Sequence, residues 1–133
     1  PAAYGQDLYH FLEGNQARVV FNEVQRQFAM PGPGNSLAEQ YTHYTYPYSI
    51  YRRVKDITTE LRRRQISGVI HYVQAFCHRA IGDIIFRNCL PVPVLTLEGN
   101  DDFYLTQHLK TRIEAFLDML RRSQRILKMA KGV

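Results

Sequence analysis

The sequence is poor in the residues and motifs that would assign a chemistry. It has no Trp and two Cys, and Cys77 and Cys89 lack the close spacing of structural zinc ligands. The five His form no HExxH pattern. No GxxxxGK[ST], GxGxxG or GxSxG motif is present either. We therefore expect no catalytic residue, no metal and no cofactor, and predict that the protein is not an enzyme.

Long uncharged runs are also missing. The uncharged run from Leu90 to Leu97 contains two Pro and is far shorter than the about 20 apolar residues that a membrane-spanning helix needs. With 133 residues, 45% of them hydrophobic, the chain is long enough to bury a core without disulfides or metals. We expect residues 1–133 to form a single helical domain and, because the chain begins with Pro, to be a fragment of a larger protein.

The spacing of apolar residues indicates helices along most of the chain. Ser36 and Glu39 match a capping box, and Ser49 is placed to cap the helix that follows it. The tract 41–48 fits either a helix or an extended strand. The expected helices cover residues 8–12, 16–29, a short segment after Ser36, 50–61, 69–89 and a last segment from about 100 to 130.

Residues 69–89 are the most apolar segment and are apolar on more than one side, which is typical of a helix at the centre of a bundle. Residues 90–97 contain two Pro, so we expect an extended crossover that packs on this helix. The predicted fold class is all-α, an irregular bundle of about five helices. Two Cys placed twelve residues apart on one helix cannot pair, which favours a reducing, intracellular compartment without distinguishing nucleus from cytoplasm.

Positive charge is concentrated in two parts of the chain. Residues 1–48 carry two basic and four acidic side chains, whereas residues 49–90 carry eight basic and three acidic ones. Such helix faces can neutralise phosphates, although a solvated helix face gives the same pattern. The candidate phosphate-binding residues are Lys55, Arg62, Arg63, Arg64, Arg121, Arg122, Arg125 and Lys128.

Tyrosines cluster just before the first of these basic segments. Five of the nine Tyr lie between Tyr41 and Tyr51. Tyrosine suits protein interfaces because it is rigid, apolar along its ring and polar at its tip, but Tyr side chains that pack over the edge of a bundle look identical in a sequence. The candidate partner-binding residues are Tyr44, Tyr46, Tyr48, Tyr51 and Arg52.

These features predict a non-enzymatic domain that binds a protein partner or a second copy of itself within a larger assembly. The clustered Tyr and the long amphipathic segment near the C-terminus favour this interpretation. The alternative is a helical module that binds DNA or RNA through its basic faces.

Overall fold

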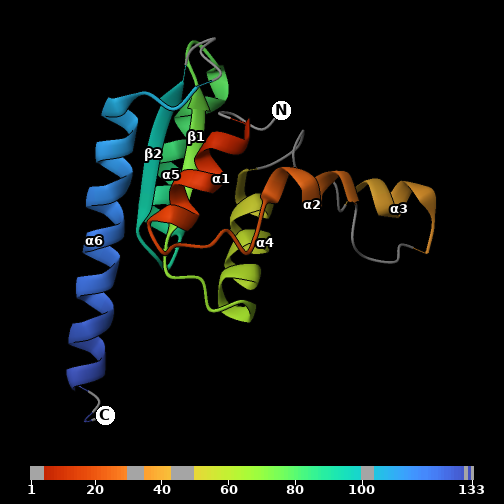
Figure 1. Cartoon of the computed structure of the whole chain (residues 1–133). Helices are drawn as coiled ribbons and strands as arrows, with labels where there is room; N and C mark the ends of the chain where they lie inside the picture. Colours follow the sequence, from red (N-terminus) through yellow and green to blue (C-terminus); the bar gives the residue numbers. More distant parts are fainter. Residues whose placement is uncertain (1–4, 30–34, 43–49, 100–103, 131, 133) are drawn as a thin grey trace.

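The computed structural model describes residues 5–29, 35–42, 50–99, 104–130 and 132 (Figure 1). Helices and strands alternate in the second half of the chain, and the described residues of the first half are mostly helical or extended. In order, the elements are α1 (Gly5–Gly14), α2 (Glu23–Ala29), α3 (Leu37–Thr42), α4 (Ile50–Arg63), β1 (Val69–Gln74), the 3₁₀ helix η1 (His78–Ile81), α5 (Gly82–Cys89), β2 (Val94–Gly99) and α6 (Gln107–Ala130).

The prediction of an all-α fold is wrong, because β1 and β2 pair as a two-stranded parallel sheet. The pairing runs in register from Val69 opposite Val94 to Gln74 opposite Gly99. The predicted central helix 69–89 is therefore a strand, a 3₁₀ turn and the short helix α5. A strand with helices on both faces is apolar on both sides, and such a run cannot be told from a buried helix by periodicity.

The predicted crossover 90–97 is wrong in its second half. The chain turns at Pro91–Pro93 and then enters β2 at Val94. The connection from β1 to β2 is the segment that contains η1 and α5, because parallel strands need a crossover to return the chain to the same end of the sheet.

One face of the sheet packs against α1 and α6. Leu97 of β2 and Ile113 of α6 are fully buried there, and Leu12 of α1 is buried in the same cluster. Ile70 and Tyr72 of β1 and Leu95 of β2 also pack on this cluster. In Figure 1, the first part of α6 stands along this side of the sheet, and its C-terminal part extends past the end of the sheet.

The opposite face packs against α4 and α5. Phe86 of α5 lies in a cluster with Ile57 and Leu61 of α4, and Val69 and Val94 of the two strands contact this cluster. Alternate strand residues thus face alternate helical layers, as the period of two in a strand requires. The result is a three-layer α/β arrangement with the sheet in the middle (Figure 1).

Several predicted helices are confirmed, but they begin or end at residues other than those predicted. The helix expected from residue 16 begins at Glu23, because the Asn22 side chain accepts hydrogen bonds from the amides of Val24 and Gln25 and so caps the helix. At α3, the Glu39 amide donates to Ser36 Oγ at 3.1 Å, which confirms the predicted cap. The last helix begins at Gln107, later than expected. In the part of the chain that the structure describes, no helix has the length and hydropathy to cross a membrane.

Candidate functional site

The carboxyl ends of β1 and β2 lie at the same edge of the sheet, because the two strands are parallel. Ligands of parallel α/β sheets bind outside this edge, where loops present side chains and free backbone groups. At this edge β1 is followed by Ala75, Phe76 and Cys77 before η1 begins at His78. The Ala75 amide donates to the Gly99 carbonyl at 2.9 Å, which ties the start of this loop to the end of β2.

Phe76 holds an unusual conformation in this loop. Its φ is 61°, in the left-handed region that a bulky residue rarely adopts, and its side chain is fully exposed. Backbone strain of this kind is concentrated at functional sites. The turn is closed by a 3.1 Å hydrogen bond from the Cys77 amide to the Gln74 carbonyl, and the half-buried Cys77 thiol makes no capping hydrogen bond to η1. The loop therefore presents an aromatic ring and a thiol at the carboxyl edge.

A hydrogen-bonded cluster lies between the sheet and α5. Asp83 Oδ1 is 2.7 Å from His71 Nδ1 and accepts a 2.6 Å hydrogen bond from Thr96 Oγ1. His71 and Thr96 are opposite each other in the strand register, so both point to the face that α5 covers. The His71 ring also meets the Phe86 ring edge-on at 4.8 Å between centroids. The cluster fastens α5, and with it the loop that carries Cys77, to the sheet.

The pKa of Asp83 reflects two opposing effects. Burial raises it, but hydrogen bonds from His71 and Thr96, with the charge of Arg87 nearby, outweigh burial and lower the pKa below its ordinary value. Asp83 is therefore ionised at neutral pH and holds His71 in a fixed orientation, as carboxylates commonly do with His that bind or react.

A second arrangement of charged groups lies at the end of α4. Glu60 is 5% exposed, and three guanidinium groups surround its carboxylate. Arg63 binds it through Nε and Nη2, Arg64 Nε is 2.6 Å from Oε2, and Arg26 Nη2 is 3.7 Å from Oε1. Hydrogen bonds from Arg63 and Arg64 lower the pKa of Glu60 to about 2, so it is ionised at neutral pH.

Asp56, one turn before Glu60, is in a different environment. Its Oδ1 accepts a 2.7 Å hydrogen bond from Arg26, whereas its buried Oδ2 has no partner among the described residues. Burial raises the pKa of Asp56, and Arg26 opposes this only in part. The two ion pairs from α4 to α2, Arg26 with Asp56 and Arg53 with Glu23, hold α2 beside α4.

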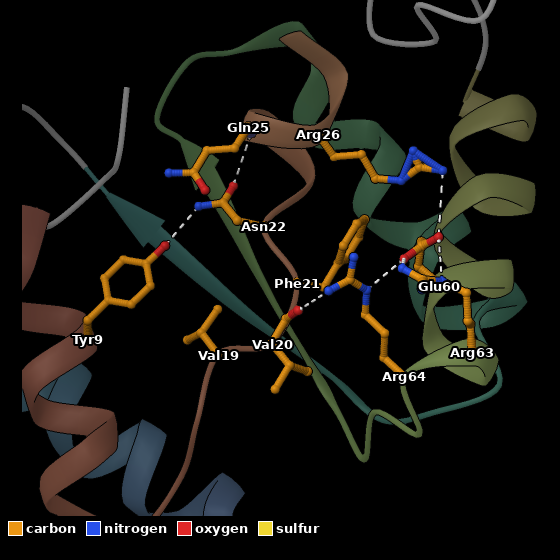
Figure 2. A pocket seen from close by; sticks show the side chains of 10 residues that line it. All are labelled: Tyr9, Val19, Val20, Phe21, Asn22, Gln25, Arg26, Glu60, Arg63 and Arg64. Atoms are coloured by element: carbon orange, nitrogen blue, oxygen red, sulfur yellow. Dashed lines mark hydrogen bonds and ion pairs between the residues drawn. The ribbon is translucent and has the colours of Figure 1, made fainter. Parts of the chain in front are cut away.

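A groove of about 540 Å³ opens beside this cluster. Figure 2 shows Tyr9 and Val19 across the groove from Glu60 and Arg63. Arg64 reaches over the Phe21 ring, 5.5 Å from its centroid, and donates to the Val20 carbonyl at 2.6 Å. The lining residues are Tyr9, Val19, Val20, Phe21, Asn22, Gln25, Arg26, Glu60, Arg63 and Arg64.

The predicted partner-binding residues are only partly visible. Tyr44, Tyr46 and Tyr48 lie outside the described residues. Tyr51 and Arg52 are both exposed on the first turn of α4. These assignments stay predictions.

The predicted phosphate-binding residues fall into two separate groups. The α4 group, Lys55 to Arg64, lies on one side of the sheet, and the α6 group, Arg121 to Lys128, lies on a helix that packs on the other face (Figure 1). Arg63 and Arg64 are engaged with Glu60, and Arg121 with Asp118 and the Asn15 carbonyl. Lys55, Arg62, Arg122, Arg125 and Lys128 are exposed. The structure thus does not merge the two groups into one basic surface.

Potential metal ligands are scattered over the described residues. Among these residues, no three His, Cys, Asp or Glu side chains come together in a way that could hold a metal ion. Cys77 and Cys89 are both free thiols, the first half-buried and the second exposed at the end of α5.

The fold and the carboxyl edge define an α/β domain built on a parallel β-α-β unit. The comparison with protein families is more specific, since the model of the family described as 2-hydroxyglutaryl-CoA dehydratase, D-component (HGD-D), matches residues 1–120. The chain belongs to this family. Comparisons with curated proteins and with solved structures found no match.

The family overturns our functional prediction. A generic protein-interaction or self-association domain is wrong, and so is the alternative of a nucleic-acid-binding module, because the family is a component of a dehydratase. The chain is thus part of an enzyme system. This conflicts with the prediction of a non-enzyme only loosely, because one component of an enzyme need not carry the reacting groups. The predicted protein partner agrees with the family description, because a component of an enzyme works together with other components.

Sequence reasoning missed the residues that the structure brings together. His71, Asp83 and Thr96 are spread over 26 positions of the sequence and meet only because the two strands pair in parallel. Treating residues 69–89 as one helix also hid the strand end before Phe76 and Cys77. The available signal was the β-branched run at Val69, Ile70 and Val73, which favours a strand as much as a buried helix.

Proposed function

We propose that this chain is the part of a 2-hydroxyacyl-CoA dehydratase component that holds the substrate thioester at the carboxyl edge of its sheet. The observation that carries the proposal is the match of the dehydratase family model over residues 1–120. The reaction named by that family removes the C2 hydroxyl and a neighbouring C–H proton of a 2-hydroxyacyl thioester as water and leaves an unsaturated thioester.

The geometry of the edge supports this location. The exposed Phe76 ring in a strained loop offers an apolar contact for an acyl chain, and the adjacent Cys77 offers a thiol at the strand end. The His71–Asp83–Thr96 cluster keeps α5 and the loop in place behind this edge. We infer that a partner component completes the enzyme, in keeping with the family description.

The test is to supply 2-hydroxyglutaryl-CoA to the protein that contains this chain, together with its partner components, and to follow loss of water from the thioester by mass spectrometry. We expect turnover, and we expect Cys77→Ala to lower its rate at least about tenfold, because Cys77 lies in the strained loop at the edge.

Cys89→Ala is the matched control, since Cys89 is an exposed thiol at the end of α5. It should leave the rate unchanged. Absence of dehydration with all components present would overturn the proposed reaction, whereas equal rates for both variants would overturn its placement at the Cys77 loop.

A further inference from the structure

The groove beside Glu60 has two unlike walls. One wall is formed by the extended segment between α1 and α2, where Val19 and Val20 are each 38% exposed and the Tyr9 ring stands beside them (Figure 2). The other wall is the charged end of α4 with Arg26 from α2. A volume of about 540 Å³ is within the range of small-molecule sites, which are typically about 300 to 1,000 Å³.

The charged wall carries an excess of positive charge. Arg26, Arg63 and Arg64 line the groove against a single lining carboxylate, that of Glu60. The excess remains when Asp56, the partner of Arg26, is counted as well. Guanidinium groups are preferred ligands of phosphates because they present several N–H donors in one plane.

Arg63 has donors left for a ligand. It binds Glu60 through Nε and Nη2, and its Nη1 has no hydrogen-bond partner in the described part of the chain. Its side chain is 61% exposed, so Nη1 is open to the groove and to solvent. Glu60 therefore orients Arg63 without consuming its capacity for an anion.

Uncommitted polar groups lie on the other side of the groove. Tyr9 Oη accepts a 2.8 Å hydrogen bond from Asn22 Nδ2, which leaves its own hydrogen to be donated. The side-chain amide of Gln25 has no hydrogen bond to any described residue. A glutamine amide can both donate to and accept from the N6/N7 edge of adenine.

We propose that this groove binds a phosphorylated adenosine, with the phosphate at Arg63, the adenine edge at Gln25 and the ring against Val19 and Val20. The source that fits this chain is the nucleotide end of a coenzyme A thioester, and this identification rests on the proposed function. A free adenine nucleotide shares the same chemistry.

The test is titration calorimetry of the full 133-residue chain with coenzyme A, ADP and pantetheine. Coenzyme A and ADP should bind, and pantetheine, which lacks the nucleotide, should not. Tighter binding of coenzyme A than of ADP would assign the site to the thioester, and equal binding would still support the phosphorylated adenosine. Arg63→Gln should weaken binding of both nucleotides about tenfold, the typical effect of one hydrogen bond to a charged group.

Arg62→Gln is the matched control, because Arg62 is the exposed neighbour on α4 and does not line the groove. It should leave affinity unchanged. Gln25→Ala gives a second variant whose side chain supports no other described residue, and it should weaken ADP binding while circular dichroism stays unchanged. Pantetheine binding as tight as coenzyme A, or full affinity in both Arg63→Gln and Gln25→Ala, would overturn the proposal.

Failure here is distinguishable from failure of the dehydratase assignment. If both Arg63→Gln and Gln25→Ala bind nucleotide as well as the wild type and dehydration is active, the groove is not the nucleotide site, but the proposed enzyme function stands. If ADP binding depends on Arg63 but the protein shows no dehydratase turnover, the nucleotide site stands and the proposed enzyme function fails.

Discussion

The carboxylate of Asp83 illustrates how single residues connect the layers of this protein. It lies on α5, is 14% exposed, and accepts hydrogen bonds from one residue of each strand. Because the hydrogen bonds from His71 and Thr96 lower the pKa of Asp83 in the folded protein, the folded state favours the ionised carboxylate more than the unfolded chain does. Asp83 therefore stabilises the fold above its unfolded pKa, near 3.8, and this contribution is lost as pH falls through the lower folded pKa.

We expect Asp83→Asn to lower the free energy of unfolding by about 1 kcal/mol at pH 7, because an amide makes weaker hydrogen bonds to His71 and Thr96. The difference between wild type and variant should shrink as the pH falls below 3.8, the ordinary pKa of an aspartate, and through the lower pKa of Asp83 in the folded state. Urea unfolding at several pH values measures both. Asp118→Asn, at an exposed ion pair with Arg121, is the control with little effect. A difference that does not change with pH would contradict the role of the charge.

Helix α6 shows how one element can be part core and part surface. Its apolar stripe is buried at Leu109, Ile113 and Leu117 against the sheet, whereas Ile126, Leu127 and Met129 are 60% or more exposed. The sequence stripe is continuous, but the sheet beneath it is short, so burial ends after about the middle of the helix.

Two substitutions of the same residue type on α6 test this division. Ile113→Ala should lower the free energy of unfolding by about 2 to 5 kcal/mol, because it removes a fully buried side chain and leaves a cavity. Ile126→Ala, at an exposed position, should change it by less than about 0.5 kcal/mol. Chemical denaturation monitored by circular dichroism gives both values. Equal effects would contradict the burial pattern of α6.

At the scale of the whole molecule, one sheet is shared by two hydrophobic clusters. Leu97 belongs to the cluster under α1 and α6, and Phe86 belongs to the cluster under α4 and α5. Because the same two strands contribute to both clusters, loss of either should release the sheet and with it the other cluster.

We therefore expect Leu97→Ala and Phe86→Ala each to lower one common unfolding transition, by about 2 to 5 and 3 to 5 kcal/mol. Far-ultraviolet circular dichroism and tyrosine fluorescence should report the same midpoint in each variant. Two separated midpoints would show instead that the layers on the two faces unfold independently.

The sequence by itself determined the features that depend on neighbours along the chain. Helix α4 has one apolar face, with Ile57 and Leu61 buried, and Ser36 caps α3, so both follow from local spacing and hydrogen bonding. The tertiary structure decided the pairing of β1 with β2, because a strand that is covered on both faces has no periodicity to set it apart from a buried helix.

The candidate sites depend on the same distinction. His71 meets Asp83, and Glu60 meets Arg26, through contacts between elements that are distant in sequence. Local composition indicated the basic residues of α4 but could not show that two of them, Arg63 and Arg64, bind a buried carboxylate. The charges of a chain can be counted from its sequence, but the partner of each charged side chain depends on which faces of helices and strands pack together. Only the tertiary structure determines that packing.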